Sequence, residues 1–344
     1  MINNEKPTGV IILAAGKGTR MKSEKPKVCF ELAGKSLVQR VVNTGLQLDA
    51  SLIGVVVGFK RDLVKKSIIE HKAIKYIYQE EQNGTGSAVI CTKEAFKDFN
   101  GNIFILCGDV PLLKAETLSK MLQQHKESQA VCTVLTMILD NPDKYGRIVR
   151  ENLITGKIKE IVEYKDANEE IRKINEINTG IYCFNSKDLY DALDKIDNNN
   201  AQNEYYLTDV IKIFYQENKV METVLLEDVN EAAGVNSQLQ LSELEYEHYQ
   251  NINRYWLSNG VTIENPSTVQ IQEDVIIEND VTICANTKLS GNTRIGKNTY
   301  IGMNSYISNS IIAQDSSLKG YNVVINANYT EQTELDWMEK KIYE

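Results

Sequence analysis

The stretch Leu13-Ala-Ala-Gly16-Lys-Gly18-Thr-Arg20-Met21 ends a short apolar run that begins at Val10. Such a run followed by glycine predicts a buried strand that turns into a loop. Glycine-rich loops expose backbone N–H groups, which bind phosphate oxygens. Arg20, and Lys27 shortly after the loop, add positive charge, and an arginine can meet a phosphate through two parallel hydrogen bonds. An ordinary strand-to-helix turn would not explain both cations, so we predict a phosphate site.

Further apolar runs at residues 53–57, 103–107 and 131–137 also predict strands. Helical patterns alternate with them, at residues 36–48, 61–71, 85–96 and 115–127. This alternation predicts an α/β fold, a Rossmann-like and mostly parallel sheet with helices on both faces. Residues 142–184 are less regular and could form a strand-rich lid. Ligands bind beyond the carboxyl ends of such strands, where Gly16, Gly84 and Asp109 fall.

After Gly260 an aliphatic residue recurs every six positions. The in-phase residues are Ile271, Ile277, Ile283, Leu289, Ile295, Ile301 and Ile307. Asn or Asp stands three positions after most of them, and these residues tolerate the left-handed backbone conformation of a corner. The repeat predicts a short left-handed parallel β-helix. It runs to about residue 326, or roughly three coils of three hexads, with a one-residue slip at Ile312.

The composition and charge of the chain exclude several classes of protein. The 344 residues are 42% hydrophobic and 25% charged, as in globular proteins of about two domains. A net charge of −9 argues against a nucleic-acid partner, and no apolar run approaches the about 18 residues of a membrane span. The start of the chain is polar and unlike a secretion signal. Six scattered cysteines and three histidines predict reduced thiols in the cytoplasm and no zinc site.

Several further motifs follow in a fixed order. They are Gln79-Glu-Glu-Gln82-Asn-Gly84-Thr85-Gly-Ser-Ala, Gly108-Asp109-Val-Pro-Leu, Tyr145-Gly146-Arg-Ile, Ile161-Val-Glu163, Glu176-Ile-Asn178-Thr-Gly-Ile, Asn199-Asn-Ala-Gln-Asn-Glu204-Tyr-Tyr-Leu-Thr-Asp and Gly234-Val-Asn236. With the first loop, this series resembles the sugar-phosphate nucleotidyltransferase superfamily, and most closely the bacterial N-acetylglucosamine-1-phosphate uridylyltransferases. The resemblance implies the nucleotidyltransferase fold for residues 1–236. We expect a linker helix at 237–258, the β-helix at 259–330 and a helical tail at 331–344.

The resemblance also implies site residues. The nucleotide would contact Leu13, Ala14, Ala15, Gly16, Lys27, Gln79, Gln82, Gly84, Thr85, Cys107, Gly108 and Asp109. A glutamine amide both donates and accepts, which matches a uracil edge. The sugar would contact Gly146, Glu163 and Asn178, and Mg²⁺ would bind to Asp109 and Asn236. From the residues alone, Asn236 is equally a helix cap and Glu163 an exposed ion-pair partner.

The implied reaction is Mg²⁺-dependent attack of N-acetylglucosamine 1-phosphate on the α-phosphate of UTP, which gives UDP-N-acetylglucosamine and pyrophosphate. The attacking phosphate has a second pKa of about 6, so no base must remove a proton, and the scarcity of histidine fits. Arg20 and Lys27 would be the catalytic residues, because their charges offset the repulsion between phosphates. Two alternatives remain open: another sugar 1-phosphate, such as glucose 1-phosphate with UTP or dTTP, and a non-catalytic nucleotide-binding or scaffold protein.

Some features depart from the resemblance. The bifunctional relatives carry a longer β-helix with an acetyltransferase, whose histidine lies on a later coil. The last histidine here is His248, before the coils begin, so we expect no acetyltransferase activity and no coenzyme A site. The coils would instead support a homotrimer. Cys107 stands where the family usually has tyrosine, and Ser87 stands where it usually has histidine. Both lie near the expected site, so the resemblance defines the type of reaction more closely than the identity of the sugar.

Overall fold

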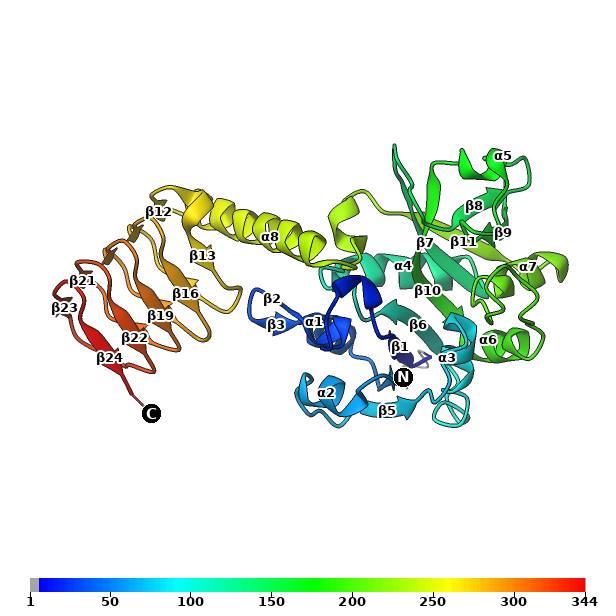
Figure 1. Cartoon of the computed structure of the whole chain (residues 1–344), viewed down its shortest axis with the longest axis horizontal. Helices are drawn as coiled ribbons and strands as arrows, with labels where there is room; N and C mark the ends of the chain where they lie inside the picture. Colours follow the sequence, from blue (N-terminus) through cyan, green and yellow to red (C-terminus); the bar gives the residue numbers. More distant parts are fainter. Residues whose placement is uncertain (1–5, 344) are drawn as a thin grey trace. The chain divides into compact units, whose positions relative to one another are not determined.

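The computed structural model describes residues 6–343 and divides the chain into two units (Figure 1). The first unit extends to Phe30 and resumes over Ser36–Gln238. The second contains Glu31–Lys35 and the chain from Leu239 onward. A five-residue hairpin within the predicted nucleotidyltransferase domain therefore belongs to the second unit. No helix among residues 6–343 is both long enough and apolar enough to cross a membrane.

The first unit is built on a mostly parallel sheet, which confirms the predicted fold class. Its strands run in the order β11 (Met221–Leu225), β7 (Cys132–Ile138), β10 (Glu176–Asn185), β6 (Asn102–Cys107), β1 (Thr8–Ala14), β4 (Leu52–Val57) and β5 (Ile74–Tyr78). Only β10 is antiparallel to its neighbours along this path. β8 (Arg147–Arg150) pairs with β10 and with β9 (Ile158–Val162). Strand β1 is nearly all aliphatic because both of its faces are buried.

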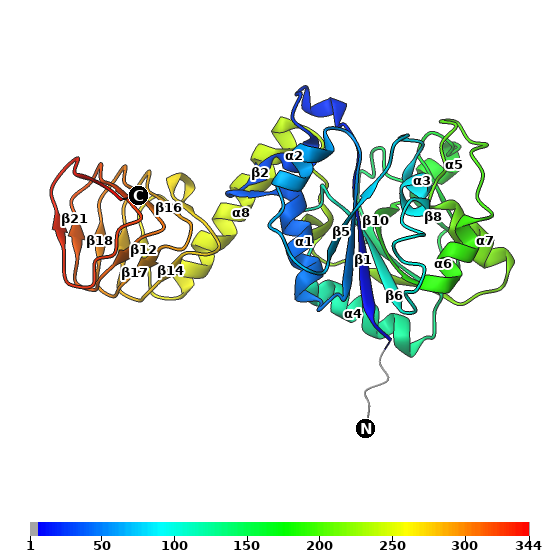
Figure 2. The same ribbon diagram turned by 90° about the horizontal axis from the view of Figure 1, so that it is seen from below.

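Helices cover both faces of the sheet (Figure 2). They are α1 (Leu37–Gln47), α2 (Arg61–Lys66), α3 (Thr85–Ile90), α4 (Ala115–Glu127), α5 (Glu169–Arg172), α6 (Ser186–Leu193) and α7 (Asp209–Gln216). Helices α1 and α4 pack into one apolar core, and α3, α6 and α7 into another on the opposite face. The helices predicted at 61–71 and 85–96 end early. Ser67 caps α2, since its backbone N–H bonds to the carbonyls of Leu63 and Val64.

The second unit contains all but the first residue of α8 (Gln238–Ser258) and a parallel β-helix. One sheet contains β12 (Thr262–Ile263), β15 (Thr282–Ile283), β18 (Tyr300–Ile301), β21 (Ser317–Leu318) and β23 (Glu334–Leu335). A second contains β13 (Gln270–Ile271), β16 (Lys288–Ser290), β19 (Tyr306–Ser308), β22 (Val323–Ile325) and β24 (Lys340–Ile342), and a third β14 (Ile276–Ile277), β17 (Arg294–Ile295) and β20 (Ile311–Ile312). The predicted hexad residues form its core.

The β-helix extends beyond the predicted end, and the expectation of a helical tail is wrong. Residues 331–344 include two strands, and β24 pairs in parallel with β22. Leu335 is buried at the position that pairs with Leu318, which itself pairs with Ile301. Two of the sheets therefore contain five strands each, more than the predicted three coils. The exposed positions of this segment combine charged residues with Trp337, Met338 and Ile342, while Leu335 occupies the inward, aliphatic position.

The left-handed corners between the strands of the β-helix allow a test of the six-residue repeat. Asn286 occupies a corner with φ +58°, a conformation that costs an ordinary L-residue about 1–2 kcal/mol. We expect Asn286→Val to lower the free energy of unfolding by about that amount and Asn286→Gly to leave it nearly unchanged. Urea unfolding of the two variants measures the difference. An equal loss in both would contradict the role of the left-handed corner.

Candidate active site

Four polar residues from distant parts of the first unit converge at the edge where β6 ends. The Lys27 ammonium bonds to Oδ2 of Asp109 and lies 2.8 Å from Oδ1 of Asn236. The Arg20 guanidinium donates to the same Asn236 oxygen, also at 2.8 Å. All four residues were predicted for the reaction centre, and the structure brings them together. Lys27 and Asp109 are largely shielded, with side chains 15% and 20% exposed.

Backbone contacts hold this cluster in place. The Val235 N–H donates to the Asp109 carbonyl at 2.9 Å, so Asn236 lies beside Asp109. The Gly108 N–H donates to the Leu13 carbonyl at 3.0 Å, which joins the ends of β6 and β1. Gly18 has φ +70°, and a Cβ there would lie 2.4 Å from Cβ of Lys27. Glycine is therefore required at this turn by the approach of the Lys27 chain.

A cavity of about 220 Å³ lies next to the first loop. Its lining consists of Leu13, Ala15, Gly16, Gln79, Gln82, Gly84, Thr85, Ala88 and Glu204. A Cβ at Gly16 would meet nothing within 4 Å, so the loop faces open space. Ala14 does not line the cavity, because successive side chains of a strand point to opposite faces and Ala14 is buried in the core with α1.

The two glutamines of the cavity differ in their contacts. Gln82 donates to the Ala15 carbonyl at 2.9 Å and so braces the loop. The amide nitrogen of Gln79 makes only long contacts, 3.4 Å to the Gly84 carbonyl and 3.5 Å to the Ser87 hydroxyl. The buried Gln79 amide is therefore the group best placed to exchange partners with a ligand.

Residues 204–207, which were not predicted as part of the site, hold one wall of the cavity in place. The Gly86 N–H donates to the Tyr205 carbonyl at 2.7 Å, and the Leu207 N–H donates to the Thr85 hydroxyl at 3.1 Å. At Gly84, φ is +102°, and a Cβ would lie 2.5 Å from the Tyr205 carbonyl. Glu204 and Ala88 line the cavity but were missed as site residues. The motif around Glu204 was visible, but its pairing with the 83–86 turn was not.

The predicted sugar residues lie together. The Asn178 N–H donates to the Gly146 carbonyl at 2.9 Å, and a Cβ at Gly146 would lie 3.4 Å from Oε2 of Glu163. The Asn178 side chain already has protein partners, since it donates to the Tyr182 hydroxyl and accepts from the Gly180 N–H. Burial raises the pKa of the Glu163 carboxyl, and neighbouring carboxylates add to the shift.

Cys107 contributes a neutral thiol. Its Sγ donates to the Gly180 carbonyl at 3.6 Å. Burial raises the pKa of the thiol to about 12, and the charge of Asp109 adds to the shift. The reactive form of cysteine is the thiolate, so Cys107 is not a nucleophile at neutral pH.

The polar cluster suits one kind of metal ion. Asp109 and Asn236 present one carboxylate and one amide oxygen to the same point, and the Lys27 ammonium that bonds to both shows that this pair of oxygens can hold a cation. Mg²⁺ takes oxygen ligands and commonly uses one or two protein groups plus substrate phosphates. Within residues 6–343, no three His, Cys, Asp or Glu side chains form a cluster able to enclose a metal by themselves. The donor set fits Mg²⁺ shared with a bound triphosphate.

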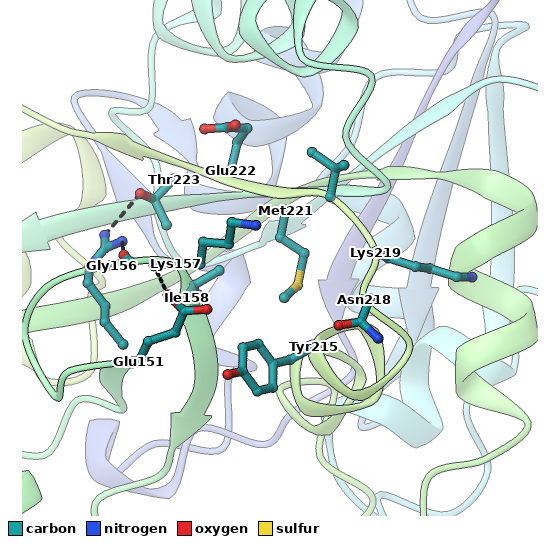
Figure 3. Close-up of a pocket in the computed structure, with 12 residues that line it drawn as sticks. Glu151, Gly156, Lys157, Ile158, Tyr215, Asn218, Lys219, Met221, Glu222 and Thr223 are labelled. Atoms are coloured by element: carbon teal, nitrogen blue, oxygen red, sulfur yellow. Dashed lines mark hydrogen bonds between the residues drawn. The ribbon is translucent and has the colours of Figure 1, made fainter.

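A second cavity, of about 490 Å³, lies away from these residues (Figure 3). Its lining comes from residues 150–158, the end of α7 and β11, and includes none of the predicted site residues. Arg150 is held there by two hydrogen bonds to Glu176, of 2.8 and 2.7 Å, and a third to Thr223. Its charge is already paired, so we assign no ligand to this cavity.

A mostly parallel sheet with a glycine loop, a cavity and converging cations at one edge is an arrangement typical of nucleotide-binding α/β proteins. The family model described as nucleotidyl transferase matches residues 9–260. The chain belongs to this family.

Individual relatives show which members of the family this chain resembles. "Bifunctional protein GlmU" of Clostridium tetani is 44% identical over 253 residues, which are 74% of this chain and 55% of that protein. The protein of the same name from Fervidobacterium nodosum is 46% identical over 254 residues, 74% of this chain and 53% of its own length. The chain therefore spans about half the length of these relatives. A UDP-glucose pyrophosphorylase solved with UDP-glucose shares the fold, with a TM-score of 0.58 at 22% identity over 71% of this chain and 99% of its own.

Asp209, near Glu163, gives a pH-dependent prediction. Burial raises the pKa of its carboxyl to about 6, and Asp197 adds to the shift. Between pH about 4 and 6 the folded chain then binds more protons than the unfolded chain, so stability falls as pH rises. We expect Asp209→Asn to be more stable than the wild type at pH 7.5, by roughly 1–2 kcal/mol after allowance for partial exposure, and to lose this advantage towards pH 4.5.

Urea unfolding at both pH values measures this effect. The exposed Asp98 provides the control, because Asp98→Asn should change stability little at either pH. A gain for Asp209→Asn that is equal at pH 4.5 and 7.5 would rule out titration as its cause.

Proposed function

We propose that this chain is an N-acetylglucosamine-1-phosphate uridylyltransferase that forms UDP-N-acetylglucosamine and pyrophosphate from UTP and N-acetylglucosamine 1-phosphate. The observation that carries the proposal is the convergence of Arg20, Lys27, Asp109 and Asn236 at the end of β6. The identity of 41–46% to proteins named GlmU supports the same substrates. The Gln79 amide would form hydrogen bonds with the edge of the uracil ring. Gly146, Glu163 and Asn178 would contact the sugar.

The reaction requires two polyanions to meet. An oxygen of the sugar phosphate attacks the α-phosphorus of UTP, and the bond to the β-phosphate oxygen breaks as pyrophosphate leaves. Arg20 and Lys27 stabilise the charge that grows on the pyrophosphate, which is electrostatic catalysis by pre-positioned cations. Asp109 and Asn236 would hold Mg²⁺, which supplies further positive charge to the triphosphate. The attacking phosphate is mostly a dianion near pH 7, so no side chain has to act as a base.

The β-helix belongs to a second part of the proposal. We propose that it assembles the chain into a homotrimer. The outward positions of one sheet support assembly, because Ile276 on β14 and Ile311 on β20, on either side of β17, are 49% and 40% exposed. Light scattering of the purified chain tests this directly: a mass of one or two copies would contradict it.

Pyrophosphate release with each substrate pair tests the reaction. We expect turnover with UTP, Mg²⁺ and N-acetylglucosamine 1-phosphate, and much slower turnover with glucose 1-phosphate or with dTTP. Preference for glucose 1-phosphate would favour the second candidate function, nucleotidyl transfer to another sugar 1-phosphate. Nucleotide binding without turnover would identify a binding protein.

Removal of a catalytic cation is the first test of the mechanism. We expect Lys27→Ala and Arg20→Ala each to lower kcat by about 10²–10³-fold, because each removes a group that stabilises the transition state. Lys25→Ala is the matched control, since Lys25 is an exposed lysine of the same loop. Wild-type turnover in both variants would overturn the assigned roles, and thermal unfolding verifies that they fold.

The metal role of Asp109 is tested by titration. We expect Asp109→Asn to raise the Mg²⁺ concentration for half-maximal rate by at least about tenfold, because a carboxylate is a stronger Mg²⁺ ligand than an amide. The exposed Asp98→Asn should leave the titration unchanged. An unaltered Mg²⁺ requirement in Asp109→Asn would remove Asp109 from the metal site.

A further inference from the structure

We infer that Arg147 is a positioning residue for the sugar phosphate. Its buried guanidinium holds Gly146, Glu163 and Asn178 in place, and because these residues contact a sugar only in the proposed function, the inference rests on that function. Arg147 is the first residue of β8 and is only 2% exposed. It lies within the first unit, as do all the residues to which its side chain bonds.

Arg147 lies where three segments of the sugar site meet. Its backbone pairs with Val162 of β9 and with Ile177 of β10. Both pairs are antiparallel, so one step back along β8 corresponds to one step forward along the other two segments. That step is occupied by the three predicted sugar residues, which therefore share one level of the sheet. The Asn178 N–H donates to the Gly146 carbonyl at 2.9 Å, as this register requires.

The guanidinium of Arg147 ties the loop before β8 to the end of α5. It donates to the carbonyl of Asp143 at 3.1 Å and to the carbonyl of Tyr145. Its Nε and Nη2 both donate to the carbonyl of Arg172, the last residue of α5, at 3.4 Å. A planar group with several donors in a fixed arrangement can serve all three acceptors at once. Because Gly146 follows Tyr145 directly, these bonds fix the backbone at the sugar site.

The same guanidinium reaches the segment that contains Glu163. Its Cζ lies 5.9 Å from the centre of the Tyr164 ring, and Cζ of Arg172 lies 4.5 Å from the same point. Arg172 also donates to the Tyr164 carbonyl at 3.2 Å. A cation over an aromatic ring is attracted by the negative face of the ring. The two arginines therefore hold Tyr164, and with it the backbone of Glu163, next to β8.

The charge of Arg147 is buried among neutral partners. Every hydrogen bond that the described part of the chain gives this guanidinium ends on a backbone carbonyl. Burial lowers the pKa of the guanidinium, although an arginine keeps its proton in proteins. A buried charge of this kind costs free energy, which the carbonyls offset in part. Removal of the side chain loses those bonds but also relieves that cost, so we expect it to disturb the geometry of the site more than the stability of the unit.

A purely structural role is the competing explanation, and the two substrates separate it from positioning. We expect Arg147→Met to raise KM for N-acetylglucosamine 1-phosphate about tenfold, because the loss of one well-placed hydrogen bond to the sugar weakens binding by about that factor. KM for UTP should change less than about twofold. A structural loss alone would reduce the amount of active enzyme and leave both KM values unchanged. That result, or an equal rise in both KM values, would overturn the inference.

Arg150 provides the matched control, because it is a second arginine of β8 that bonds to protein acceptors. Its guanidinium donates to Glu176 and to Thr223, and its side chain is 17% exposed. Arg150→Met should lower the thermal midpoint at least as much as Arg147→Met, because it leaves a partly buried carboxylate without its partner. It should leave KM for both substrates within about twofold of the wild type. A tenfold rise in KM for the sugar phosphate in both variants would overturn the positioning role.

Hydrogen exchange provides a readout that does not depend on activity. The Asn178 N–H is bonded to the Gly146 carbonyl, and the Tyr145 N–H is bonded within its own turn. We expect both amides to exchange at least about tenfold faster in Arg147→Lys, which keeps the charge but has a single nitrogen, and at the wild-type rate in Arg150→Lys. If the wild type makes no UDP-sugar, the proposed function fails, whereas unchanged exchange in Arg147→Lys overturns the positioning role by itself.

Discussion

In the proposed reaction, repulsion between phosphates is the constraint that the first unit has to overcome. The unit meets it by placing two cations, Arg20 and Lys27, against one carboxylate and one amide oxygen. A cluster of this kind is stable before any substrate binds, because the ammonium is paired with Asp109. Triphosphate would bind to the two cations and Mg²⁺ to the two oxygens, so the charges that the ligands bring would meet partners that are already in place. The low cost of that exchange is what a pre-positioned electrostatic site provides.

The scaffold supports this cluster mainly through the backbone. The bond between Val235 and Asp109 joins residues far apart in the sequence, and glycine at position 18 allows the Lys27 chain to approach the first loop. Backbone hydrogen bonds do not depend on side-chain rotamers, so they fix the position of the Cα atom from which each functional side chain extends. The side chains then need only short reaches: both Arg20 and Lys27 meet the same Asn236 oxygen.

The fold was predictable where a residue pattern is local and periodic. Alternating apolar runs predicted the parallel sheet, and hexads predicted the β-helix core. The end of the β-helix was missed because its coils shorten: Ile283 pairs with Ile301, 18 positions later, but Ile301 pairs with Leu318 and Leu318 with Leu335, 17 positions later. The slip at Ile312 therefore marks a new period. Extending that period would have placed Leu335 inside the core and shown that the tail continues the coil.

The site was predictable only in part, because its residues meet through tertiary contacts. The first loop and Asp109 carry their own local signals, whereas Asn236 alone was indistinguishable from a helix cap. Ser36 caps α1, because its hydroxyl accepts a hydrogen bond from the Gln39 N–H, and this is a local contact of a kind that a sequence pattern can predict. Gly34 and Lys35, just before it, make contacts that no local pattern contains, since Gln272 and Asp274 lie more than two hundred positions away. Local chemistry can explain why a glycine is allowed at position 34. Only the tertiary partner explains why nothing larger fits there.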